Sequence, residues 1–161
     1  MKITNKRLIE LIKEEILAIR ESKALITEAT RSTVAIEDKK GRISGTYIHS
    51  DGYVDGVGAT LKKNYSKLDK IEALLNLGEF GISSLGKSIK GGDDHSFNNK
   101  KKGETVFYGR DRGESNDMTS SFKDRETFAS QHAEEFAYLY SEKDKKWYYT
   151  TDDQNFGWQE L

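Results

Sequence analysis

The fold is decided by residues 31–49, RSTVAIEDKKGRISGTYIH. Two runs rich in Val, Ile, Thr and Tyr, residues 31–36 and 42–49, flank the turn sequence 38–41, which is a pattern typical of a β-hairpin. Because alternate side chains of a strand point to the same side, Tyr47 and His49 share one face of the second strand.

Further along the chain, residues 135–140 and 146–150 flank the polar segment 141–145 and predict a second hairpin, and residues 104–108 have strand composition. Helical patterns occupy 66–77 and 123–132, while 87–103 has no period and predicts a long surface loop. Strands in hairpins with helices grouped between them indicate an α+β fold. We expect an antiparallel sheet of about five strands with helices on one face.

The chain begins with a long amphipathic helix. Its apolar residues recur at steps of three and four, which places them on one face, and charged residues occupy the other; the apolar residues are Leu8, Leu11, Ile12, Ile16, Ile19 and Ile26. The stripe must be covered, either by the sheet or by a second copy of the chain, and we expect a homo-oligomer formed through this helix. The organisation is therefore a helix over 1–29, used for packing or oligomerisation, and a single α+β domain over 30–161.

Composition narrows the function classes. The 161 residues include no cysteine, which excludes disulfides and thiolate chemistry and favours the cytoplasm as the location. A net charge of -1 disfavours bulk nucleic-acid binding. Charged residues interrupt every apolar run, so neither a signal peptide nor a membrane span is expected.

A glycine-punctuated run follows the first hairpin and opens a predicted helix. Asp51 and Tyr53 lie at its start, and Gly56 and Gly58 stand where free backbone N–H groups and the helix dipole can hold an anion. The spacing lacks the P-loop and dinucleotide-binding fingerprints. The alternative, which the missing fingerprints favour, is that both glycines permit a tight turn.

Two arginines follow the predicted strand that contains Tyr108. Arg110 and Arg112 can together hold a diphosphate, because guanidinium groups bind phosphate oxygens in pairs. The alternative is that Asp51, Asp55 or Asp111 pairs with these arginines in a structural network. The nucleotide hypothesis needs both guanidinium groups to face the glycine-opened helix across an unfilled hollow.

Histidines offer limited catalytic chemistry. His49 is a candidate general base, and the neighbouring Asp51 carboxylate is a candidate for orienting its ring. His95 follows two aspartates, but three adjacent residues cannot converge on one ion from a regular element, so we predict no metal site and no cofactor. The absence of other catalytic motifs favours a binding protein over an enzyme. Tyr47, Tyr53 and Tyr108 are candidates for stacking on a base.

An ordered set of motifs runs through residues 30–149: Tyr47, His49, DGY at 51–53, GVG at 56–58, Leu61, SSLG at 83–86, HSF at 95–97 and YGRDRGE at 108–114. This set resembles a family of small proteins encoded by tailed phages and bacterial mobile elements. Family members often have Trp in place of Ser50 and Pro in place of Val54, and many lack the long leading helix.

The resemblance implies a phage accessory protein that acts against host defences in the host cell cytoplasm. The leading hypothesis is a non-catalytic binder that sequesters a phosphate-bearing nucleotide immune signal, such as a cyclic nucleotide or an ADP-ribose derivative. One alternative is a protein-binding inhibitor of a host defence complex, of the anti-CRISPR type. Another is an enzyme that degrades the signal with His49 and Asp51 as acid and base.

Overall fold

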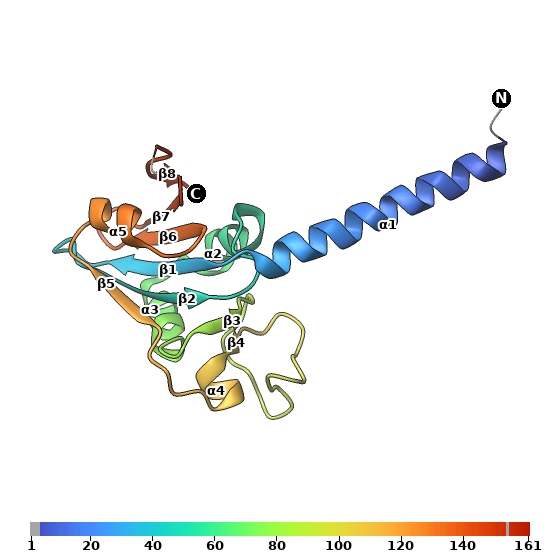
Figure 1. Ribbon diagram of the computed structural model, residues 1–161. Coiled ribbons are helices and arrows are strands. Elements are labelled where there is room, and N and C mark those ends of the chain that lie inside the picture. The colour runs from blue at the N-terminus through green and yellow to red at the C-terminus, as the bar shows by residue number, and fades with distance from the viewer. Residues whose placement is uncertain (1–3, 154) are drawn as a thin grey trace.

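The computed structural model describes residues 4–153 and 155–161. A long helix, α1 (Asn5–Ala29), projects from an α+β domain whose centre is an eight-stranded sheet (Figure 1). Thr4 caps the helix, since its hydroxyl accepts a hydrogen bond from the Arg7 N–H. The predicted leading helix is confirmed. No helix among the described residues is both long and apolar enough to cross a membrane.

Both predicted hairpins are present. The first joins β1 (Ser32–Glu37) to β2 (Ile43–Ile48), with Gly41 at φ 82° in the turn, and the second joins β6 (Phe136–Ser141) to β7 (Lys146–Thr151). Between and after the hairpins lie four shorter strands. These are β3 (Ile82–Ser84), β4 (Val106–Phe107), β5 (Thr119–Phe122) and β8 (Gln159–Glu160).

The expectation of a five-stranded antiparallel sheet is wrong. The strand order is β4-β3-β2-β1-β6-β7-β8, and β5 pairs with β2 as well. The sheet is mixed because β1 runs parallel to β6, and β2 runs parallel to β3. Each hairpin is antiparallel within itself, but the two hairpins join through their first strands, which run in the same direction.

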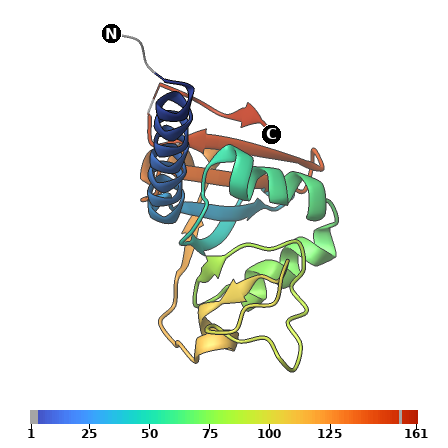
Figure 2. The same cartoon turned by 90° about the vertical axis from the view of Figure 1, so that its right-hand side faces the viewer.

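Helices cover both faces of the sheet, so the expectation of helices on one face is also wrong. After the π-helical turn η1 (Val54–Gly58), α2 (Ala59–Asn64) and α3 (Leu68–Leu77) pack on one face. On the other face lies α5 (Arg125–Gln131), whose Phe128 packs against Ala35 and Leu139. Figure 2 shows α2 and α3 to one side of the sheet. Two buried clusters lie on opposite faces because side chains alternate along a strand. Val34 of β1 belongs to the cluster under α2 and α3, and its neighbour Ala35 belongs to the cluster under α5.

A smaller lobe is built from β3, β4, α4 (Tyr108–Arg112) and the loop 87–103 (Figure 1). The loop has little regular structure, as predicted, yet it is tied to the lobe at several points. Gly91 N–H donates to Glu104, and His95 lies against Asp111 with only 1% of its side chain exposed. The lobe therefore has its own polar anchor, and this anchor involves the predicted arginine segment.

Candidate functional site

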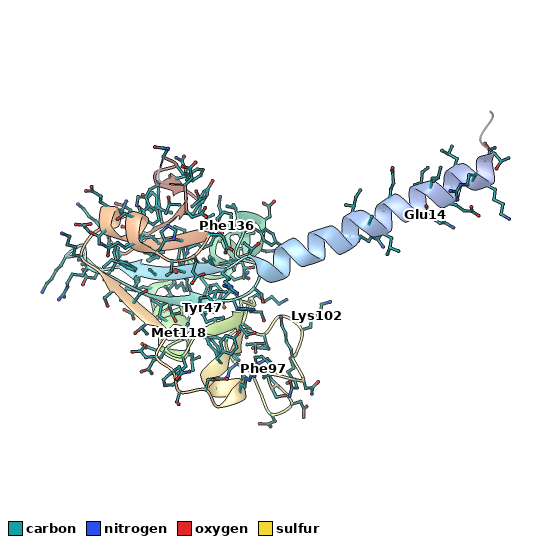
Figure 3. All side chains as sticks on the ribbon, viewed as in Figure 1. Glu14, Tyr47, Phe97, Lys102, Met118 and Phe136 are labelled. Atoms are coloured by element: carbon teal, nitrogen blue, oxygen red, sulfur yellow. The ribbon has the colours of Figure 1, made fainter. Side chains whose placement is uncertain are left out.

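Three of the predicted site residues, Tyr47, His49 and Tyr108, meet in one pocket of about 220 Å³. The pocket lies between the end of β2 and the small lobe, and its other lining residues are Phe80, Glu114, Asn116 and Met118. Figure 3 shows Tyr47 and Met118 close together at this junction. Pockets for drug-sized ligands measure roughly 300–1,000 Å³. This one has room for a single planar ring system, and any attached groups would remain outside.

A hydrogen-bonded pair forms one wall of the pocket. The Tyr47 hydroxyl lies 2.6 Å from His49 Nδ1, as expected for alternate residues at the end of one strand. Burial raises the pKa of Tyr47 above its ordinary value, so the phenol keeps its proton and can donate it to Nδ1. The ring hydrogen of a neutral His49 then sits on Nε2. His49 is thereby oriented by Tyr47 rather than by Asp51.

The opposite wall depends on the turn that precedes β3. Gly81 has φ 92°, and a Cβ atom there would lie 3.2 Å from the Tyr108 ring and 3.4 Å from the Met118 side chain. The Tyr108 N–H donates to the Gly81 carbonyl, and the Met118 N–H donates to the Glu79 carbonyl. Glycine at this position therefore allows the two side chains to close around the turn.

Arg112 stands next to the pocket mouth. Its Nε lies 3.4 Å from Glu114, a lining residue, and its guanidinium covers the Phe97 ring at 4.7 Å. The Phe97 ring in turn lies 5.8 Å from that of Tyr108. Half of the Arg112 side chain, 52%, remains exposed. A positive charge with unused donors is thus connected to the pocket wall through two aromatic rings.

Arg110 has a different environment. Its guanidinium donates to Asp111 through Nε at 2.9 Å and Nη2 at 3.1 Å, to the Ile89 carbonyl at 2.6 Å and to the Thr105 carbonyl at 3.1 Å. The two carbonyls belong to either end of the loop region, so Arg110 ties that region to α4. This matches the structural-network alternative, with Asp111 as the carboxylate partner.

Asp111 is the centre of the anchor, with 4% of its side chain exposed. Besides Arg110, it accepts hydrogen bonds from the Phe107 N–H at 2.8 Å and from His95 Nε2 at 3.3 Å. His95 Nδ1 accepts the Lys101 N–H, which leaves the ring hydrogen on Nε2. Burial alone would raise the pKa of Asp111, but the hydrogen bonds from Arg110 and Phe107 outweigh it and hold the pKa below its ordinary value.

The glycine-opened run does not join the pocket. The N–H groups of Gly56 and Gly58 both donate to the Tyr53 carbonyl, and that of Val57 donates to the Asp51 carbonyl. A Cβ atom at Gly56 would meet the Asp51 carbonyl oxygen, and one at Gly58 would lie 3.1 Å from the Tyr138 ring. Both glycines therefore serve close packing, and the donors predicted to hold an anion are used within the turn.

The predicted hollow between two arginines and the glycine run is thus replaced by a pocket with different walls. Tyr47, His49 and Tyr108 come together, with Arg112 at the edge; Arg110 belongs to the anchor, and Asp51, Tyr53, Gly56 and Gly58 belong to the turn after β2. Sequence reasoning missed Phe80, Asn116 and Met118, which lie in irregular segments. Met118 could have been noticed in the sequence, because it is a large apolar residue in a polar stretch. In the structure its side chain remains 39% exposed.

The ordered motifs quoted from the sequence lie at the end of β2 and in the turn after it, in α2, in the β3 region, and in α4 with the loop that it anchors. Within the described residues, no group of three or more His, Asp or Glu side chains is arranged to hold a metal ion. Compared with protein-family models, curated proteins and solved structures, the chain matches none of them.

Proposed function

We propose that this protein binds a small phosphate-bearing nucleotide without catalysis, and that the base enters the pocket between Tyr47 and Tyr108. The observation that carries the proposal is the pocket itself, in which three residues selected from the sequence gather beside Phe80 and Met118. Aromatic and thioether groups suit the faces of a planar base. The volume of about 220 Å³ suits the base alone, which leaves the sugar and phosphate outside.

Polar groups at the pocket supply recognition of the base edge. Asn116 offers both hydrogen-bond donors and an acceptor, and Glu114 offers acceptors. Such groups discriminate strongly between related ligands, because a ligand that lacks the matching group leaves them unpaired. A preference for one base over another is therefore expected.

Phosphate binding falls to Arg112 in this proposal. Arg110 is already satisfied by four hydrogen bonds, whereas Arg112 has one weak ion pair and a half-exposed guanidinium. The diphosphate grip by both arginines is dropped for this reason. A single arginine favours a ligand with one phosphate group near the base.

The biological role follows from the phage-protein resemblance and rests on it alone. A phage protein that holds a nucleotide signal tightly removes it from the defence system that produced it, and no chemistry is needed. The degrading-enzyme alternative loses support because His49 Nδ1 accepts from Tyr47, which puts the ring hydrogen on Nε2 and leaves the neutral ring no free lone pair to act as a base. In this proposal the protein acts in the host cytoplasm by sequestering the nucleotide signal.

The test is a ligand screen on the purified full-length chain. Nucleosides, mononucleotides, cyclic dinucleotides and cyclic ADP-ribose isomers are added separately, and the thermal unfolding midpoint is measured. At least one phosphate-bearing ligand should raise the midpoint and be recovered intact after heating, as read by mass spectrometry. Recovery of an altered ligand would establish the enzyme instead, and no shift with any ligand would contradict the proposal.

Two variants locate the binding site. Asn116→Trp should fill the pocket and abolish the shift, while Asn76→Trp, an exposed position on α3, should leave it unchanged. Arg112→Ala should weaken the binding of a phosphate-bearing ligand about tenfold or more and leave the binding of a nucleoside unchanged. Its control is Arg7→Ala, because Arg7 is similarly exposed, at 56%, and has one carboxylate at 3.5 Å.

A further inference from the structure

The helix α1 leaves its apolar side chains in solvent. From Thr4 to Arg20 every residue is exposed except the half-buried Leu11. Large apolar residues remain 45–66% exposed along this helix, namely Leu8, Ile9, Ile12, Ile16, Leu17 and Ile19. Figure 1 shows the helix extending away from the sheet. The helix has 25 residues and is about 37 Å long, and helices in proteins draw most of their stability from packing of an apolar face, which is not covered here between Thr4 and Arg20.

The exposed side chains follow a seven-residue repeat. With Ile9 as position a, isoleucine fills four consecutive core positions: Ile9 and Ile16 at a, and Ile12 and Ile19 at d. In the sequence, Lys23 takes the next a position and Ile26 the next d position. Spacing of this kind forms the seam of a coiled coil.

We propose that the occupant of this seam is α1 of two further copies of the chain, arranged in parallel. Isoleucine at both a and d favours three or more strands over two. Leu8, at position g, extends the apolar surface beyond the a and d positions, as a seam with more than two strands requires.

The charged residues beside the seam favour helices that run parallel to each other. In a parallel coil, position g of one helix faces position e five residues further along its neighbour, which brings Glu15 to Arg20 of the next copy. In an antiparallel coil, e positions face each other, so Lys13 and Arg20 would repel. The assembly would present three copies of the domain at the C-terminal end of the coil. This inference does not depend on the nucleotide proposal.

The test is the mass of the full-length protein in solution, by sedimentation equilibrium at micromolar concentration. The wild type should have three times the mass of the 18.3 kDa chain. Ile16→Glu should give the mass of a single chain, because it places a charge in the seam. Leu17→Glu, one residue away at position b, should keep the three-chain mass. The thermal midpoint of the domain should be the same in both variants, which shows that each is folded.

Orientation is tested by cysteine cross-linking. The chain contains no cysteine, so Asn5→Cys, at position d, introduces a unique thiol near the free end of α1. Parallel helices place these thiols next to each other, and oxidation should give disulfide-linked chains in high yield. A wild-type mass other than that of three chains, identical behaviour of Ile16→Glu and Leu17→Glu, or failure of the thiols to cross-link would overturn the proposal.

Discussion

Arg110 and Arg112 stand two residues apart on α4 and have opposite surroundings. Arg110 makes four hydrogen bonds and covers the Phe107 ring, with 27% of its side chain exposed. Arg112 has one carboxylate at 3.4 Å and is 52% exposed. Helical residues two apart point about 200° from each other, which explains the contrast. Two arginines that are close in the sequence therefore need not share one binding site.

The two sides of the short helix α4 therefore have different roles. The inner side of α4, with Arg110 and Asp111, holds the loop 87–103 to the lobe. The outer side, with Arg112 and Tyr108, borders the pocket. Substitutions on the two sides should accordingly separate stability from ligand binding.

The largest effect is expected from Asp111→Ala. The change removes the acceptor for Arg110, His95 and the Phe107 N–H, and leaves a partly buried cation without its partner. The free energy of unfolding should fall by about 3 kcal/mol, measured by urea denaturation. Glu114→Ala, which removes the exposed partner of Arg112, should cost less than about 0.5 kcal/mol. Equal losses would show that the anchor is no stronger than a surface pair.

Arg110→Ala should have the next largest effect. The carbonyls of Ile89 and Thr105 and the Asp111 carboxylate lose their donor, although water can replace part of these hydrogen bonds because Arg110 is 27% exposed. We expect a loss of about 2 kcal/mol in the free energy of unfolding and faster hydrogen exchange in 87–103. An unchanged stability would mean that Arg110 is free to bind a ligand after all.

The fold could be predicted from the sequence where patterns are long and local. Six-residue strands with a turn between them and a helix with a regular apolar stripe were identified correctly. The strands β3, β4, β5 and β8 have two to four residues, too few to establish a period. The parallel pairing of β1 with β6 joins segments about one hundred residues apart, and no local pattern encodes it.

The residues of the candidate pocket could be predicted to lie together only where strand alternation brings them to one face. Tyr47 and His49 were placed together correctly because His49 directly follows β2 and continues the alternation of its side chains. Phe80, Asn116 and Met118 reach the pocket from irregular segments, whose direction depends on the Gly81 turn. Likewise, the donors of Gly56 and Gly58 are used by carbonyls of the preceding turn, a detail of backbone path that glycine spacing does not reveal.

A smaller effect is expected in the pH dependence of stability. The folded pKa of Asp111 is below its ordinary value of about 3.9, so its stabilising contribution is complete above that pH and is lost as the pH falls further. Asp111→Asn should therefore destabilise the protein at pH 7 by more than at pH 3. The measurement is urea denaturation of both proteins at several pH values. A difference that stays constant with pH would contradict the role of the charged carboxylate.

The smallest effect on stability is expected from Arg112→Ala. Its ion pair is exposed and its stacking on Phe97 is at the surface, so the free energy of unfolding should fall by less than about 1 kcal/mol. Combined with the loss of phosphate-dependent binding proposed above, this would complete the contrast with Arg110. A large destabilisation would place Arg112 in the anchor instead.

The most direct test of the pocket uses Met118. The sequence contains two methionines, Met1 and Met118, so a protein labelled with methyl-¹³C methionine gives one NMR signal from the pocket and one from the N-terminus. A base bound between Tyr47 and Tyr108 should shift the Met118 methyl signal through its ring current and leave the Met1 signal in place. A nucleotide that binds by calorimetry without moving the Met118 signal would contradict this assignment of the site.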